Sequence, residues 1–142
     1  MKEQNFKNHM QLVPGYHGLT FLAIIALLVG SLINLANSAS ENLYSASLIT
    51  LVAFILCLLF WYIRSFALRA QDRAIRAEEN LRHFVLTGKP IPEGIRMGQV
   101  IALRFASNEE FPGLTTRALH ENLSNTDIKK AIQHWRADYY RA

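Results

Sequence analysis

The chain has 142 residues, a net charge of +4 and a single cysteine, Cys57, which excludes an intrachain disulfide. The charge is uneven: residues 64–142 carry 13 Lys and Arg and 9 Asp and Glu, whereas the first 63 residues carry two Lys and two Glu. This asymmetry indicates two unlike parts and is typical of a role beside a membrane surface or a polyanion.

Two long apolar segments follow a polar leader, residues 1–18. Residues 19–35 and 46–63 contain no charged side chain. Each is close to the length that crosses a hydrocarbon core of about 30 Å. The two segments and their connection, residues 36–45, predict a transmembrane hairpin over 19–63.

The positions of lysine and arginine predict the orientation of the hairpin. The connection 36–45 has neither residue, whereas Lys2 and Lys7 precede the first segment and several arginines follow the second. Because cytoplasmic flanks carry the excess of Lys and Arg, both termini are expected in the cytoplasm. The competing interpretation is a signal peptide cleaved near Ala36–Ser38. The length of the first segment and the few charges before it argue against cleavage.

Small side chains recur on one face of each apolar segment and let helix backbones approach closely. They are Ala23, Ala26 and Gly30 in the first segment and Ala46, Thr50, Ala53 and Cys57 in the second. Two interpretations stay open: both stripes hold the hairpin together, or one of them docks a larger membrane partner.

The second segment is expected to continue as one helix from about Ser45 to Thr87, where Gly88 and Pro90 end it. Its cytoplasmic part carries apolar residues at near-heptad spacing, which we call the seam. The seam consists of Phe66, Ala70, Ala74, Ala77, Leu81 and Phe84. We expect it to join the core of a cytoplasmic domain or to bind a partner.

The remaining chain predicts three short helices, near 96–106, 108–122 and 125–140. The patterns Ser107–Glu110 and Ser124–Asp127 match helix-capping boxes and separate them. No strand-like alternation occurs. The predicted fold is therefore all-α: a two-helix transmembrane hairpin whose second helix extends into a small cytoplasmic helical domain, residues 64–142. The expected core residues are Val100, Ile101, Phe105, Leu114, Leu119, Ile128 and Trp135.

Two groups of cations are candidate binding residues. The first follows the second apolar segment and either only sets orientation or also attracts anionic lipid: Arg64, Arg69, Arg73 and Arg76. The second lies near the C-terminus and either contacts a polyanion or belongs to an amphipathic helix whose aromatic residues are core: Lys129, Lys130, Arg136 and Arg141. A nucleic-acid partner is not expected, because no recognised module accompanies these charges.

No catalytic, cofactor-binding or metal-ligating residue is expected. The chain has no Gly-rich phosphate loop and no HExxH or GxSxG pattern. Glu79 and His83 are four residues apart on the predicted helix, but a structural metal needs about four ligands. Arg104 lies in an apolar stretch and is either exposed or, as we expect, buried in an ion pair with an acid such as Glu109 or Glu110.

Five segments together resemble a family of small two-span bacterial membrane proteins classed as a domain of unknown function. They are 5–9, 14–17, 70–84, 101–112 and 127–141. The resemblance implies a bacterial inner-membrane setting and supplies no activity or catalytic residue.

The leading hypothesis is a non-enzymatic accessory subunit or adaptor, anchored in the inner membrane, whose cytoplasmic domain contacts a protein. The expected partner is a larger membrane complex or a second copy of the chain, paired through the seam. The alternative function is a membrane-tethered protein that binds nucleic acid or anionic lipid.

Overall fold

The computed structural model describes residues 5–6 and 12–138, and the described residues are helical apart from loops and one isolated bridge between Ala106 and Trp135. The all-α prediction is confirmed. The chain divides into two compact units, one over Leu12–Ala67 and one containing the residues from Leu68 onward. We call the first the hairpin unit and the second, which includes the end of α2, the helical domain.

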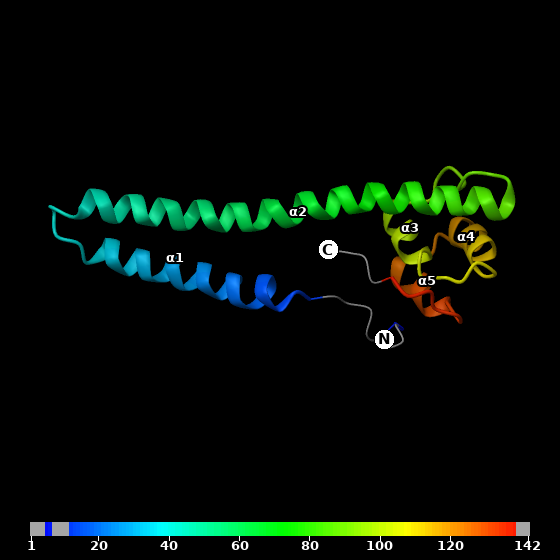
Figure 1. Cartoon of the computed structure of the whole chain (residues 1–142), viewed down its shortest axis with the longest axis horizontal. Helices are drawn as coiled ribbons and strands as arrows, with labels where there is room; N and C mark the ends of the chain where they lie inside the picture. The colour runs from blue at the N-terminus through cyan, green and yellow to red at the C-terminus, as the bar shows by residue number, and fades with distance from the viewer. Residues whose placement is uncertain (1–4, 7–11, 139–142) are drawn as a thin grey trace. The chain divides into compact units, whose positions relative to one another are not determined.

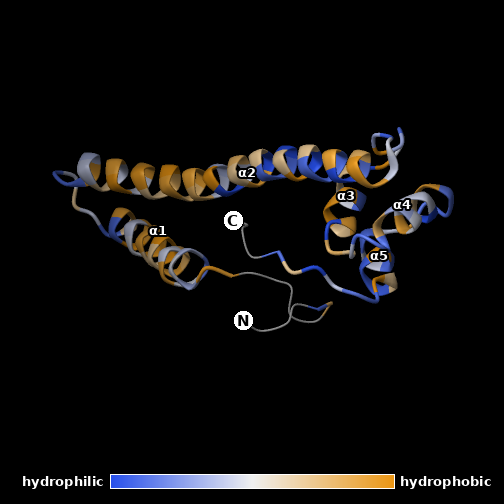
Figure 2. Cartoon of the chain, turned by 45° about the vertical axis from the view of Figure 1, so that its right-hand side comes forward, coloured by the Kyte–Doolittle hydropathy of each residue, from blue (hydrophilic) through white to orange (hydrophobic). Residues whose placement is uncertain are grey.

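The hairpin unit contains the two apolar helices (Figure 1). A π-helical segment, Pro14–Thr20, leads into α1, Phe21–Ala36, and after a short connection α2 spans Leu43–Thr87. The continuous helical stretch Pro14–Ala36, which joins the π-helical segment and α1, is long and apolar enough to cross a membrane, and so is α2. Figure 2 shows the hydrophobic colour along α1 and along the first part of α2. The two predicted apolar segments therefore form helices.

Helix α2 contacts α1 through small side chains and contacts the π-helical segment through aromatic rings. Ser31, Ala46 and Ala53 are buried, and the Thr50 hydroxyl donates a hydrogen bond to the Ser31 carbonyl at 3.1 Å. The Tyr16 ring stacks on the Phe60 ring, with the ring centroids 4.3 Å apart.

The two predicted stripes of small residues have different surroundings. Cys57, like Thr50, is partly buried beside the buried Ala46 and Ala53, so the stripe of α2 lies in the hairpin contact. Ala23, Ala26 and Gly30 are exposed, and a Cβ added at Gly30 meets no atom within 4 Å. The stripe of α1 therefore does not pack against α2. Its docking on a partner stays a prediction.

Helix α2 ends where the sequence predicts. Gly88 has a φ of +73°, a left-handed conformation that glycine adopts without steric cost. Its N–H donates to the Phe84 carbonyl at 2.8 Å and closes the last turn. Glycine after the last helical residue thus terminates the helix.

Three short helices follow α2 in the helical domain (Figure 1). They are α3, Met97–Leu103; α4, Phe111–His120; and α5, Asn125–Ala131. The predicted core residues are either buried in the core of the helical domain or packed against it. Buried residues include Ile75, Ile95, Val100, Leu103, Phe105, Phe111, Leu114, Ala118, Ile128 and Ile132, with Ile101, Leu119 and Trp135 packed beside them.

The predicted helix over 125–140 is wrong beyond Ala131. Ile132 is extended, with φ −68° and ψ 123°, and its side chain is buried in the core. The Glu110 carboxylate accepts the backbone N–H groups of Gln133 and His134, at 3.1 and 2.9 Å. These bonds replace those of a further helical turn, so the chain continues as an extended segment.

The expectation that the seam joins the core is also wrong. Its six residues are exposed, with Leu81 at 63% and Phe84 at 53% relative exposure. The face of α2 that packs on the domain carries Ile75, Glu79 and His83 instead. Polar side chains can take this face because they are bonded there: Glu79 pairs with Arg82 and Arg136, and His83 binds the Lys89 carbonyl.

Candidate functional site

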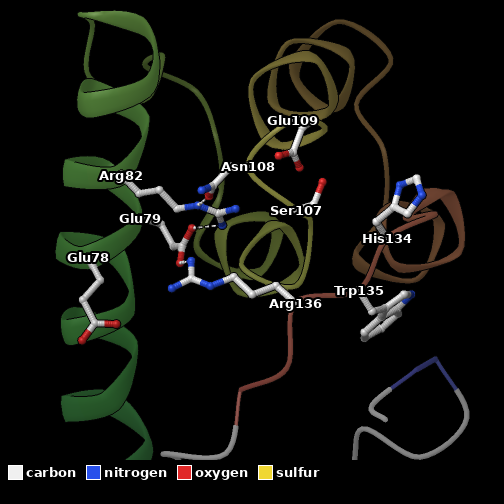
Figure 3. A pocket seen from close by; sticks show the side chains of 9 residues that line it. All are labelled: Glu78, Glu79, Arg82, Ser107, Asn108, Glu109, His134, Trp135 and Arg136. Atoms are coloured by element: carbon white, nitrogen blue, oxygen red, sulfur yellow. Dashed lines mark hydrogen bonds and ion pairs between the residues drawn. The ribbon is translucent and has the colours of Figure 1, made fainter.

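A buried ion cluster joins α2 to the loops of the helical domain. The Glu79 carboxylate lies 2.9 Å from the Arg82 guanidinium, and the two side chains are 7% and 10% exposed. Arg136, which belongs to the C-terminal segment, lies 3.7 Å from the same carboxylate. Figure 3 shows the Arg82 and Arg136 guanidinium groups on either side of Glu79, with Glu78 pointing away.

Arg82 is held by four groups at once. Besides Glu79, it donates to the Asn108 side chain at 2.9 Å and to the Ala106 carbonyl at 2.7 Å. Its guanidinium also lies over the Phe111 ring, 4.4 Å from the centroid. Because these partners come from the α3–α4 loop and α4, Arg82 fixes that loop against α2.

An open pocket of about 640 Å³ adjoins this cluster (Figure 3). It is lined by Glu78, Glu79, Arg82, Ser107, Asn108, Glu109, His134, Trp135 and Arg136. Several of its polar groups bind one another: Glu79 pairs with two arginines, and Asn108 accepts from Arg82. The pocket is therefore a polar recess within the structural network of the domain.

Glu110 fastens the C-terminal segment. Besides the N–H groups of Gln133 and His134, its carboxylate contacts the His134 ring at 2.7 Å. Next to it, the Ser107 N–H donates to the His134 carbonyl at 3.1 Å. The segment after α5 is thus attached to the start of α4.

Two exposed carboxyl groups, those of Glu109 and Asp127, have a pKa below the ordinary value. A hydrogen bond from the Ser107 side chain lowers the pKa of Glu109, and the charges of His134 and Arg82 lower it further. A hydrogen bond from Ser124 lowers the pKa of Asp127. Hydrogen bonds to the ionised form of a carboxyl favour that form.

Glu79 and His83, which are four residues apart on α2, bind different partners. Glu79 binds arginines, whereas His83 Nδ1 lies 2.7 Å from the Lys89 carbonyl. No group of three or more His, Cys, Asp or Glu with metal-binding geometry occurs within residues 5–6 and 12–138.

Arg104 forms an ion pair, but with a residue other than those expected. Its guanidinium lies 3.2 Å from the Asp138 carboxylate, and its side chain is 7% exposed. Glu110 binds the C-terminal segment instead. The expected buried ion pair is therefore present, but its acid is Asp138 rather than Glu109 or Glu110, because the extended segment after α5 brings Asp138 to Arg104.

The two groups of cations are placed differently. On α2, Arg69, Arg73 and Arg76 are exposed and spaced by four and three residues, so they share one flank of the helix beside the seam, whereas Arg64 is partly buried. On α5, Lys129 is partly buried with its ammonium 5.7 Å from the Phe105 ring centroid. The other members of this second group are Lys130, which is exposed, Arg136, which pairs with Glu79, and Arg141, which lies outside the described residues.

Neither the Glu79–Arg82 pair nor the role of Glu110 was predicted from the sequence. The available signal for the first was the three-residue spacing of an acid and a base on a helix, which brings the side chains together. For Glu110, no local signal exists, since its partners lie 23 and 24 residues further along the chain.

These features define an all-helical protein with two helices long and apolar enough to cross a membrane and a small helical domain built on the end of the second. The chain belongs to a family of unknown function, DUF6526, whose family profile matches residues 1–142. No curated protein and no solved structure matches the chain.

Proposed function

We propose that the chain is a non-enzymatic accessory subunit or adaptor of the bacterial inner membrane, with both termini in the cytoplasm. The two apolar helices support the membrane anchor. The Lys and Arg residues after the second apolar segment, and their absence from the connection 36–45, support the orientation. The helical domain then lies on the cytoplasmic side, where it is available to other proteins.

The observation that carries this proposal is the exposed seam. Within the helical domain, Ala70, Ala74, Ala77, Leu81 and Phe84 are exposed, while the buried residues of α2 are Ile75, Glu79 and His83. Contiguous exposed apolar surface on a folded domain marks an interaction site, because burying it against a partner is favourable. A seam with coiled-coil spacing is suited to a helix as its partner.

The bonds that the buried polar side chains make support an adaptor rather than an enzyme. Glu79, Arg82 and Glu110 bind one another or the backbone across loops, which fixes the shape of the domain. A folded domain with an exposed helical face can act as an adaptor without a catalytic residue.

The test is a pull-down of the full chain from native membranes in mild detergent. The seam variant carries Ala77→Glu and Leu81→Glu, and the matched control carries Thr116→Glu at an exposed position of α4. We expect a stoichiometric protein partner with the unmodified chain and the control, and its loss with the seam variant. A chain that binds no protein, including a second, differently tagged copy, contradicts the proposal. Equal recovery by the seam variant also contradicts it.

A further inference from the structure

The part of the exposed seam within the helical domain, from Ala70 to Phe84, has the register of a coiled-coil interface. In the heptad notation abcdefg, Ala74 and Leu81 occupy a positions, and Ala70, Ala77 and Phe84 occupy d positions. This assignment places apolar residues at every a and d position from Ala70 to Phe84. All five side chains are exposed.

The helical domain covers the positions that a coiled coil leaves outside. The buried residues of α2 in this domain are Ile75 at b, Glu79 at f and His83 at c. In a two-stranded coiled coil, b, c and f point away from the partner helix. The packing of the domain on α2 therefore leaves the a and d positions open to a second helix.

The charges beside the seam complement those of an identical helix. Arg73 occupies a g position and Glu78 the following e position, and both are exposed. In a parallel pair, the g residue of one helix faces the next e residue of the other, which places Arg73 opposite Glu78 in both directions. An antiparallel pair loses this complementarity.

We infer that the seam pairs with the seam of a second copy of this chain, parallel and in register. This inference rests on the proposed function, since anchoring in one membrane gives two copies the same direction and a high effective concentration. The alanines at 70, 74 and 77 allow close approach of the helices. Leu81 and Phe84 add the larger apolar contacts at the end of α2.

Cysteine crosslinking of the full chain in membranes tests the contact. In a Cys57→Ala background, single cysteines replace Ala74 and Ala77 in the seam, and Arg69 and Arg76 at the two exposed c positions. We expect disulfide-linked dimers to form at least about tenfold faster at the seam positions, where equivalent residues of the two helices meet. Equal rates at all four positions, or no dimer at any, overturn the inference.

Charge exchange tests the parallel register independently. Arg73→Glu or Glu78→Arg alone places like charges opposite each other and is expected to slow crosslinking through a cysteine at 77. The double variant restores the opposite-charge pairs and is expected to restore the rate. Failure of the double variant to restore it overturns the parallel register.

Pull-downs with two different tags separate the two possible failures. If a different protein binds the seam and no crosslink forms between copies, the inference is overturned while the adaptor function stands. If no protein of either kind is recovered, the proposed function itself fails. Recovery of the differently tagged copy, lost with Ala77→Glu and Leu81→Glu, supports the inference.

Discussion

The Glu79 carboxylate and the Arg82 guanidinium lie 2.9 Å apart on successive turns of α2 and are both buried against the α3–α4 loop. The helical domain thus contacts α2 through a charged pair as well as through Ile75. A buried charge requires its partner, because the interior of a protein solvates an isolated ion poorly.

Replacing Arg82 with methionine is expected to destabilise the helical domain strongly. Glu79 then keeps only the longer contact with Arg136, and the Ala106 carbonyl loses a donor. Breaking a buried pair costs about 3–5 kcal/mol of unfolding free energy. Chemical unfolding of the full chain in detergent, followed by circular dichroism, measures the change. The control is Arg117→Met, which breaks an exposed pair with Glu121 and is expected to cost less than about 1 kcal/mol. Equal costs for both variants contradict the structural role of Arg82.

Glu110→Ala is expected to release the segment after α5. The N–H groups of Gln133 and His134 lose their acceptor, and hydrogen bonds of this charged type are worth about 1.5–3 kcal/mol. Hydrogen exchange at these two amides reports the release directly. We expect faster exchange there with little change in the amides of α4.

The control for this experiment is Glu109→Ala, the neighbouring carboxylate, which binds Ser107 instead. It is expected to leave the amides of Gln133 and His134 protected. Loss of protection in both variants shows that removing a charge, rather than the specific acceptor, opens the segment.

The cap of α5 is expected to make the helical domain sensitive to acid. Ser124 accepts the Asp127 N–H and donates to its carboxylate, which lowers the pKa of Asp127 below its ordinary value of 3.8. A lowered folded-state pKa contributes stability above the unfolded-state pKa, and that stability is lost as the pH falls through the folded-state value. Ser124→Ala is therefore expected to lower the unfolding midpoint more at pH 7 than at pH 3.

The direct measurement is an NMR titration of the Asp127 carboxyl, whose pKa is expected to rise toward 3.8 in the Ser124→Ala variant. Thr116→Ala, at an exposed position of α4, serves as the control and is expected to leave this titration unchanged. An unchanged Asp127 pKa in Ser124→Ala shows that the hydroxyl does not stabilise the ionised form.

Local patterns predicted the helices where a single segment determines its own structure. The uncharged segments 19–35 and 46–63 specify apolar helices by their length, and Gly88 specifies the end of α2 because its left-handed backbone favours glycine. Both features depend on neighbouring residues only.

The face of α2 that binds the domain was not predictable in this way. Hydrophobic spacing favoured the seam with Leu81 and Phe84, yet the domain covers Ile75, Glu79 and His83. A polar face becomes buried only when other groups satisfy it, and here distant groups do so: Asn108 binds Arg82, and Arg136 approaches Glu79. Likewise, α5 ends early because of Glu110, a residue of a different element. Such nonlocal bonds leave no periodic pattern in the sequence.

The contact between α1 and α2 is expected to tolerate a larger side chain on the exposed stripe of α1 but not on the buried stripe of α2. Ala53 is fully buried in this contact, so Ala53→Leu overpacks it and is expected to cost about 1–3 kcal/mol. Ala26→Leu is the matched control, because it makes the same chemical change on the exposed stripe of α1. The measurement is the unfolding midpoint of the full chain in a mild detergent. A lower midpoint for Ala53→Leu alone shows that the stripe of α2, and not that of α1, closes the hairpin. The opposite order contradicts this packing and places Ala26 in the contact instead.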